Sequence, residues 1–267
     1  MSFARLSAAI AAVGTPLCIG IDPHPGAIGT DAAGVLTFGR AVIAAAKGRV
    51  PAVKPQFAFF EALGWEGMRV LAAVCAEARA ADLIVVADAK RGDIGTTAAA
   101  YAAAVLGPNA PFPADILTVS PFLGLDTLQP FVDVARATDR AVYVLLRTSN
   151  PGSATFQDPA EAALCAWLRV NEDVAGAVVG ATHAEALKRL RTALPNTAFL
   201  LPGYGAQGGT AEDLRPAFSG PALVVSARGA TLPEPAERAA WDRDPATWIA
   251  DRIDRIRADL TRAGIGA

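Results

Sequence analysis

The sequence has 267 residues, is 52% hydrophobic and 19% charged, and carries a formal net charge of −2. This length fits one α/β barrel, and the apolar content is enough for a large core, which excludes a disordered chain. The balance of charge argues against a dedicated nucleic-acid-binding protein, although one cationic pocket for a phosphate is compatible with it.

The N-terminal segment is rich in alanine, but it lacks a basic region, and its apolar residues continue into an apparent core strand. We therefore do not interpret it as a signal peptide. No long apolar run is free of Gly, Pro and charge, so we expect no membrane span. Cys18, Cys75 and Cys165 are widely spaced within apolar runs, which is typical of buried cysteines in a reducing, cytoplasmic protein. The sequence has no close cluster of Cys and His, so we expect no structural zinc site.

Eight short apolar runs recur along the chain, each followed by Gly, Pro or polar residues and then by an alanine-rich stretch. Their starts lie 24 to 33 residues apart, which is enough for a strand, a helix and two loops. They contain few charges, as is typical of parallel strands that are covered on both faces. The predicted strands are Leu17–Asp22, Val50–Lys54, Leu83–Ala89, Ala114–Val119, Ala141–Arg147, Val174–Gly180, Ala198–Leu201 and Ala222–Ala227.

Eight such units favour a closed (β/α)₈ TIM barrel over an open sheet. No linker or change of composition marks a second domain, so we expect one domain over residues 1–267, with a core of about 15–230 and a helical tail of about 232–267. Within the tail, the segment 244–265 has apolar residues at helical spacing and predicts a final helix.

Polar residues collect where the predicted strands end. Barrel enzymes build their active sites at this rim, from residues on several strands. Strands often end in polar residues, but this tendency does not account for charged residues at the ends of several buried strands. The rim residues are Asp22, Lys54, Asp88, Lys90, Ser120, Arg147, Ser149 and Arg228.

The most informative segment is LIVVADAKRGDIGTT, residues 83–97. Alternation along a strand places Asp88 and Lys90 on the face that Ile84 and Val86 present to the barrel interior. Asp93 follows in the loop, where it can turn towards the mouth of the barrel or reach a neighbouring subunit. Such an array holds an ammonium between carboxylates and keeps it protonated. A structural ion pair would give the same short pattern, but the longer string is far more specific.

This string resembles the signature D-x-K-x-x-D-I-G-x-T of the orotidine 5'-phosphate decarboxylases, at the end of their third barrel strand. Five further segments match that family in order: GIDPHP (20–25), VKPQF (53–57), TSNPG (148–152), PGYGAQGG (202–209) and SARG (226–229). The resemblance covers about residues 15–230 and is strongest to the larger bacterial subgroup, type 2. Thr96 and Asn150 depart from residues that are common in the family.

The resemblance implies a cofactor-free carboxy-lyase that converts orotidine 5'-monophosphate (OMP) to UMP and CO₂, the final step of de novo UMP biosynthesis. In this reading Lys90 donates the proton, Asp88 lies beside the departing carboxylate, and Lys54 completes the charges. The remaining implied contacts are Asp22 and Lys54 with the ribose, Ser149 with the pyrimidine amide edge, Gln207 and Arg228 with the phosphate, and Asp93 and Thr97 with the second site of a homodimer.

Two alternatives stay open from the residues themselves. A metal-dependent sugar-phosphate decarboxylase or synthase of the same superfamily shares D-x-K-x-x-D, but it needs a Glu ligand where Lys54 stands, and a cation there repels Mg²⁺. A non-catalytic nucleotide-binding barrel would not need an intact array. The two histidines, His24 and His183, resemble a turn residue and a helix start, which disfavours a Ser-His-Asp hydrolase. We expect the stripe Phe57, Phe59, Phe60 to be core.

Overall fold

The computed structural model describes residues 2–28, 31–181, 184–205 and 208–266. In this part of the chain the strands form a closed parallel barrel in sequence order, β1 to β8, with β8 pairing back to β1. The predicted TIM barrel is confirmed, and each strand lies within two residues of its predicted bounds. The strands are β1 Leu17–Ile21, β2 Ala52–Pro55, β3 Ile84–Arg91, β4 Ile116–Val119, β5 Ala141–Arg147, β6 Ala175–Val179, β7 Phe199–Pro202 and β8 Ala222–Ser226.

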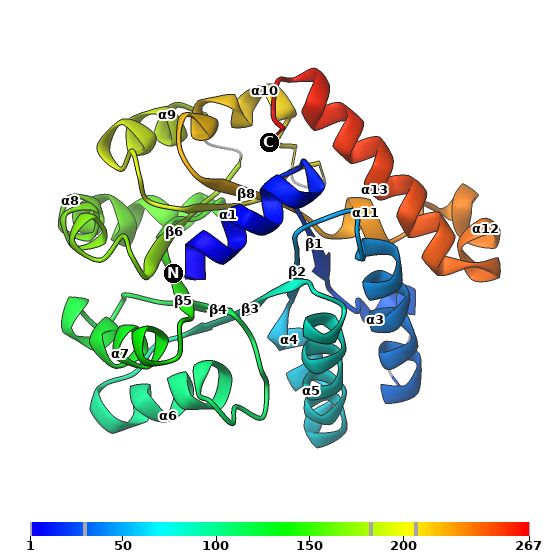
Figure 1. Cartoon of the computed structure of the whole chain (residues 1–267), viewed down its shortest axis with the longest axis horizontal. Coiled ribbons are helices and arrows are strands. Elements are labelled where there is room, and N and C mark those ends of the chain that lie inside the picture. The colour runs from blue at the N-terminus through cyan, green and yellow to red at the C-terminus, as the bar shows by residue number, and fades with distance from the viewer. Residues whose placement is uncertain (1, 29–30, 182–183, 206–207, 267) are drawn as a thin grey trace.

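Helices surround the barrel and connect one strand to the next (Figure 1). Short 3₁₀ turns interrupt several of the connections. The helices are α1 Ser2–Val13, α2 Pro25–Ile28, α3 Ala32–Ala46, α4 Phe57–Glu61, α5 Gly64–Ala80, α6 Gly95–Leu106, α7 Gln129–Ala137, α8 Ala154–Val170, α9 Ala184–Ala193, α10 Ala211–Leu214, α11 Arg228–Thr231, α12 Arg238–Arg243 and α13 Pro245–Arg262. None of them is long and apolar enough to cross a membrane.

Two apolar cores explain why the strand sequences alternate so little. One core fills the barrel interior and includes Cys18, Ile84, Val86 and the large ring of Tyr143. The other lies between the strands and the surrounding helices, with residues such as Val85 and Ala87. Successive residues of a strand point to opposite faces, and here both faces are buried, so nearly every strand position is apolar. The three cysteines are buried, as predicted.

The N-terminal segment forms a helix that the sequence pattern did not predict. Figure 1 shows α1 lying across one end of the barrel. Leu6 is buried with the interior core, and Phe3 packs against Tyr143 with ring centroids 5.3 Å apart. Arg5 binds the buried Asp115, which precedes β4. Helix α1 therefore closes the N-terminal end of the barrel and leaves the carboxyl ends of the strands for a site.

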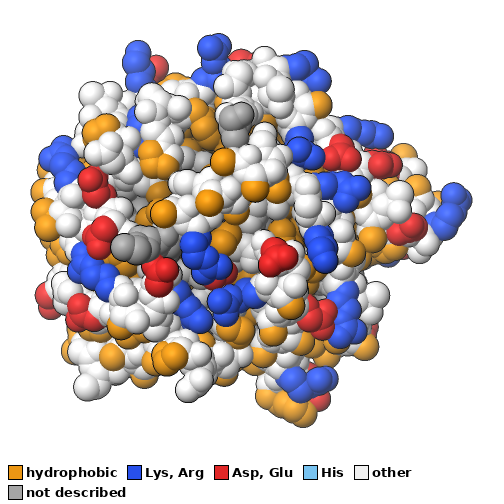
Figure 2. All heavy atoms as spheres, in the orientation of Figure 1, with side chains coloured by type: hydrophobic (Ala, Val, Ile, Leu, Met, Phe, Trp, Pro, Cys, Tyr) orange, Lys and Arg blue, Asp and Glu red, His pale blue; other side chains and the backbone are white. Residues whose placement is uncertain are grey.

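The face shown in Figure 2 is the face that α1 closes, since both figures share one orientation. Lysine and arginine side chains lie interspersed with aspartate and glutamate over this face. A nucleic-acid-binding surface would be expected to carry a continuous basic stripe.

The C-terminal tail contains the predicted helix. Asp244 is the N-cap of α13 and accepts a hydrogen bond from the Thr247 amide, and Pro245 occupies the first turn. The apolar face of α13 packs on α3, with Ile249, Ile253 and Leu260 buried among the helices outside the barrel. That the chain forms one domain stays a prediction.

Candidate active site

A cavity of about 350 Å³ opens at the carboxyl ends of the strands. Its floor is apolar and comes from the inward-facing residues Leu145, Val178, Leu200 and Val225. Its polar lining comes from strand ends and the loops that follow them: Asp22, His24, Lys54, Gln56, Asp88, Lys90, Thr118, Thr148, Ser149, Tyr204 and Arg228. An apolar pocket with a few convergent polar groups is the usual form of a site for a small molecule.

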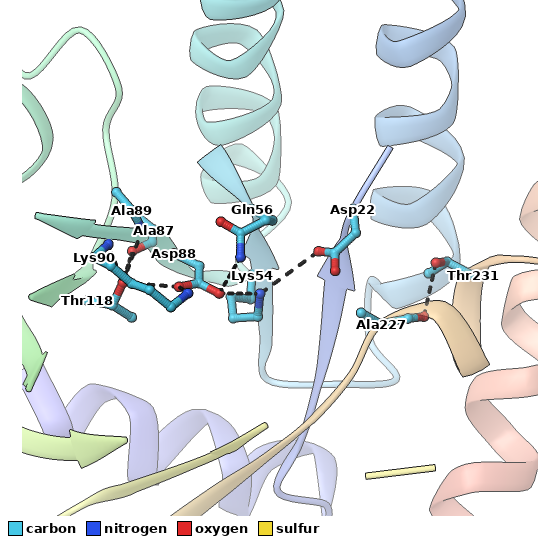
Figure 3. A network of polar contacts seen from close by, with 10 residues as sticks. All are labelled: Asp22, Lys54, Gln56, Ala87, Asp88, Ala89, Lys90, Thr118, Ala227 and Thr231. Carbon is cyan, nitrogen blue, oxygen red and sulfur yellow. Dashed lines mark hydrogen bonds and ion pairs between the residues drawn. The ribbon is translucent and has the colours of Figure 1, made fainter. Parts of the chain in front are cut away.

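Four charged side chains alternate in sign along one wall, and we call Asp22, Lys54, Asp88 and Lys90 the charge network (Figure 3). The ammonium of Lys54 lies 2.8 Å from Asp88 Oδ2 and 3.9 Å from Asp22 Oδ1. The ammonium of Lys90 lies 2.5 Å from Asp88 Oδ1. Each oxygen of the Asp88 carboxylate therefore has its own lysine.

The two lysines of the charge network differ in how deeply they are buried. The Lys54 side chain is 5% exposed and that of Lys90 is 46% exposed. Burial disfavours the Lys54 ammonium, but Asp88 and Asp22 outweigh this effect and raise the pKa of Lys54 above its ordinary value. Burial likewise opposes ionisation of Asp88, yet Lys54 and Lys90 hold the pKa of that carboxyl far below its ordinary range. Lys54 and Asp88 are therefore a fixed ion pair.

Asp22 lies at the other end of the network and differs from Asp88. Burial raises the pKa of the Asp22 carboxyl, and Lys54 at 3.9 Å compensates only in part. Within the described residues, the buried Oδ1 of Asp22 accepts no hydrogen bond. This oxygen can accept a hydroxyl from a ligand in the cavity.

Lys90 reaches the cavity from an irregular strand. Its φ is +49°, in the left-handed region that non-glycine residues seldom adopt. The pairing of β3 with β4 shifts between Ala87 and Arg91, which marks a bulge at this point. The prediction that Asp88 and Lys90 face the barrel mouth is confirmed, but simple alternation along a strand is not the reason for Lys90.

Two neutral residues complete the surroundings of Asp88, and the sequence analysis missed both. Gln56 Nε2 donates to Asp88 Oδ2 at 2.9 Å, and the Thr118 hydroxyl lies 3.1 Å from Asp88 Oδ1. Each carried a signal in the sequence. Gln56 follows Lys54 by two residues, and Thr118 is the polar residue inside the apolar run of β4.

The structure brings together most of the predicted site residues but not all of them. Ser149 and Arg228 line the cavity with the charge network. Asp93 and Thr97 do not line it: the Asp93 carboxylate accepts the Ile94 amide at 2.8 Å, and Thr97 is exposed on the first turn of α6. Gln207 and His183 lie outside the described residues.

The predicted phenylalanine stripe lies only partly in the core. Phe57 and Phe60 are buried as predicted, but the prediction of a core position is wrong for Phe59, which lines the cavity. It packs against His24, with ring centroids 5.3 Å apart. Both residues follow strand ends, on short segments that turn over the mouth of the barrel, and this turn accounts for the difference.

Tyr204 connects the cavity to the C-terminal helix. It lines the cavity in the Gly-rich segment after β7, and its hydroxyl donates to Asp259 of α13. Gly203 and Gly205, on either side of it, have φ values of 108° and 75°. Side chains at these two positions would strain the backbone, which explains the glycines.

The donor set does not resemble a metal centre. Among the described residues, no three His, Cys, Asp or Glu side chains come close enough together to hold a metal ion. The carboxylates of Asp22 and Asp88 face an ammonium instead, and that cation repels Mg²⁺.

Comparison with known proteins agrees with the geometry. The model of the "Orotidine 5'-phosphate decarboxylase / HUMPS family" matches residues 15–240. The chain is 39% identical to the orotidine 5'-phosphate decarboxylase of Rhodopirellula baltica, over 97% of this chain and 96% of that one. It is 45% identical to the enzyme of that name from Deinococcus radiodurans, over 76% and 78%. The solved structure of Leishmania donovani OMP decarboxylase matches it with a TM-score of 0.76 and 32% identity, over 100% of this chain and 99% of that one.

Proposed function

This chain belongs to the orotidine 5'-phosphate decarboxylase family and converts OMP to UMP and CO₂ in pyrimidine biosynthesis, and we propose that the charge network carries out this reaction without a metal or cofactor. The observation that supports the proposal is the alternation of two ammonium groups with two carboxylates at the barrel mouth. The network supplies fixed charge and a proton, which are the two things that the chemistry requires.

Loss of CO₂ breaks the bond between C6 of the pyrimidine and its carboxylate, and the electron pair stays on C6. That pair lies in the ring plane outside the π-system, so resonance does not stabilise it. An ammonium held where the negative charge develops stabilises it and can then give it a proton. Lys90 is this donor: a proton moves from Nζ to C6, and solvent reprotonates the amine that remains.

Asp88 and Lys54 set the field around that transfer. Asp88 lies beside the departing carboxylate, and Lys54 completes the array with its buried ammonium. Since Asp88 stays ionised, it keeps the Lys90 ammonium directed along one line. Its negative charge also repels the carboxylate of bound OMP, and this repulsion ends when CO₂ leaves.

The rest of the cavity fits the other parts of the nucleotide. Asp22 and Lys54 bind the ribose hydroxyls, which suits the free acceptor capacity of Asp22 Oδ1. Ser149 binds the amide edge of the pyrimidine, and Arg228 binds the phosphate together with Gln207.

We propose a homodimer in the cytoplasm, with active sites shared between subunits. In this assembly Asp93 and Thr97 complete the partner's site. Ile94, next to Asp93, is 63% exposed, and the exposed rings of Phe122 (71%) and Phe156 (65%) lie with their centroids 5.5 Å apart. Exposed large apolar side chains favour a buried role in an interface.

The direct test is OMP turnover, followed by ultraviolet absorbance in the presence of EDTA. We expect full activity without metal. Activity lost to EDTA and regained with Mg²⁺ would favour a metal-dependent reaction. Lys90→Ala should reduce kcat by several orders of magnitude while the protein stays folded. A variant that keeps more than about a tenth of kcat has lost less than ~1.4 kcal/mol, too little for the proton donor.

Shared sites are tested by subunit exchange between Asp93→Ala and Lys90→Ala proteins. Random exchange makes half of the dimers mixed, and each mixed dimer has one intact site of two, so activity should rise to about a quarter of wild type. If native mass spectrometry shows mixed dimers and activity does not return, Asp93 serves its own subunit.

A further inference from the structure

The bulge in β3 faces a single residue of the neighbouring strand. Ala87 pairs with Leu117 and Arg91 pairs with Val119. The segment 88–90, which carries both Asp88 and Lys90, is therefore opposed by Thr118 alone. A regular parallel ladder would supply backbone partners along this stretch, and the bulge removes them.

The Thr118 hydroxyl takes the place of those partners (Figure 3). It accepts the Ala89 amide at 3.0 Å and the Lys90 amide at 2.9 Å. Its own proton is directed to Asp88 Oδ1 at 3.1 Å, or to the Ala87 carbonyl at 3.4 Å. The residue is 2% exposed, so water has little access to compete for these bonds.

We propose that Thr118 is a positioning residue, which fixes the backbone of Lys90 and the carboxylate of Asp88 relative to each other. The proposal rests on the role of Lys90 described above. A left-handed backbone at a lysine is strained, and it persists only where surrounding contacts hold it. The two hydrogen bonds from amides 89 and 90 to Thr118 supply that hold.

The hydroxyl has a second consequence during turnover. When Lys90 gives its proton to C6, Asp88 Oδ1 loses its ammonium partner and faces a neutral amine. The neutral donor Thr118 stays with that oxygen throughout, as Gln56 does with Oδ2. The carboxylate therefore keeps its orientation, and Lys90 returns to the same place when it is reprotonated.

The experiment compares Thr118→Val, which keeps the shape of the side chain and removes the hydroxyl, with Thr118→Ser, which keeps the hydroxyl. We expect kcat at least tenfold lower in the valine variant, with the KM for OMP changed less than threefold. The serine variant should keep kcat within about threefold of wild type. Thr197→Val is the matched control, because Thr197 is fully buried and its hydroxyl has no partner among the described residues.

Three results distinguish the possibilities. A valine variant that loses less than tenfold in kcat overturns the proposal, as does a serine variant that loses as much as valine. If Lys90→Ala stays active, the proposed role of Lys90 fails instead, whatever Thr118 does. If the valine variant does not fold, Thr118→Ala takes its place. Alanine also lacks the hydroxyl, and its smaller side chain leaves room for water to bond the two buried amides, which favours folding.

Discussion

Replacing Lys54 by methionine should destabilise the protein in a pH-dependent way. The substitution keeps the length of the side chain and removes the one ammonium that lies between two carboxylates. Asp88 would retain Lys90 and two neutral donors, whereas Asp22 has no other cation within salt-bridge distance among the described residues.

Two comparisons give the size of the effect. Removing one partner of a buried ion pair typically costs about 3–5 kcal/mol, because the other charge stays buried. For a chain of this size each 1 kcal/mol lowers Tm by about 2–4 °C, so the expected loss is roughly 6–20 °C. The upper end is expected where both carboxylates are ionised.

The dependence on pH follows from Asp22. Its pKa is already raised by burial, and loss of Lys54 raises it further. A carboxyl whose pKa is higher in the folded than in the unfolded state stabilises the fold at low pH, and this contribution is lost as pH rises through the folded pKa. Asp88 in the native protein has the opposite shift, and its contribution is lost only as pH falls below its ordinary range. The deficit of the Lys54→Met variant should therefore be smaller at pH 5 than at pH 8.

Thermal unfolding of both proteins by circular dichroism, at pH 5 and at pH 8, measures this deficit. Lys47→Met is the control, since Lys47 is exposed where α3 ends. Its Tm should change by less than about 2 °C at either pH. A Lys54→Met variant as stable as wild type, or one with the same deficit at both pH values, would refute the reasoning.

Three further predictions concern other parts of the barrel. Gly20→Ala should lower both stability and kcat/KM, because the new Cβ would lie 2.4 Å from the Cβ of Ala227, which precedes the proposed phosphate ligand Arg228. Gly26→Ala, with open space around it, should lower neither. Arg191→Met should lower the free energy of unfolding by about 3–5 kcal/mol, measured with urea, because its buried guanidinium donates five hydrogen bonds to backbone carbonyls around β7 and β8. Arg228→Ala should raise KM for OMP more than for phosphate-free orotidine; equal losses would exclude a phosphate contact.

Much of the fold was predictable because both faces of each strand are buried. A short continuous apolar run such as LCIGI of β1 is typical of a parallel strand that is buried on both faces. Helix α1 was not predicted, since its alanine-rich sequence has a weak pattern. What fixes it is the fit of Leu6 into the barrel and the ion pair of Arg5 with Asp115, both contacts with distant segments.

The site was predictable to the extent that it depends on strand ends. Asp22 follows β1, and Lys54 and Asp88 lie in the carboxyl-terminal halves of β2 and β3. Parallel strands bring these ends together around the cavity. The bulge at Lys90 depends on a hydroxyl of the next strand, 28 positions away in sequence, so alternation within one strand does not reveal it. Within the described chain, Asp93 accepts the amide of its neighbour Ile94 and Thr97 is exposed, so neither reaches the cavity of its own subunit. A second subunit is the proposed reason.

The two lysines divide the work of the network by their burial. A proton donor must exchange protons with solvent once in every cycle, and the proposed donor Lys90 can do so because its side chain is about half exposed. Lys54 is nearly inaccessible and its pKa is raised, so it keeps its charge throughout the cycle. If the two were equally buried, reprotonation would be slow; if both were exposed, water would screen the field that Asp88 requires. The same asymmetry explains why Asp88 needs Thr118 and Gln56: of its two ammonium partners only one is permanent.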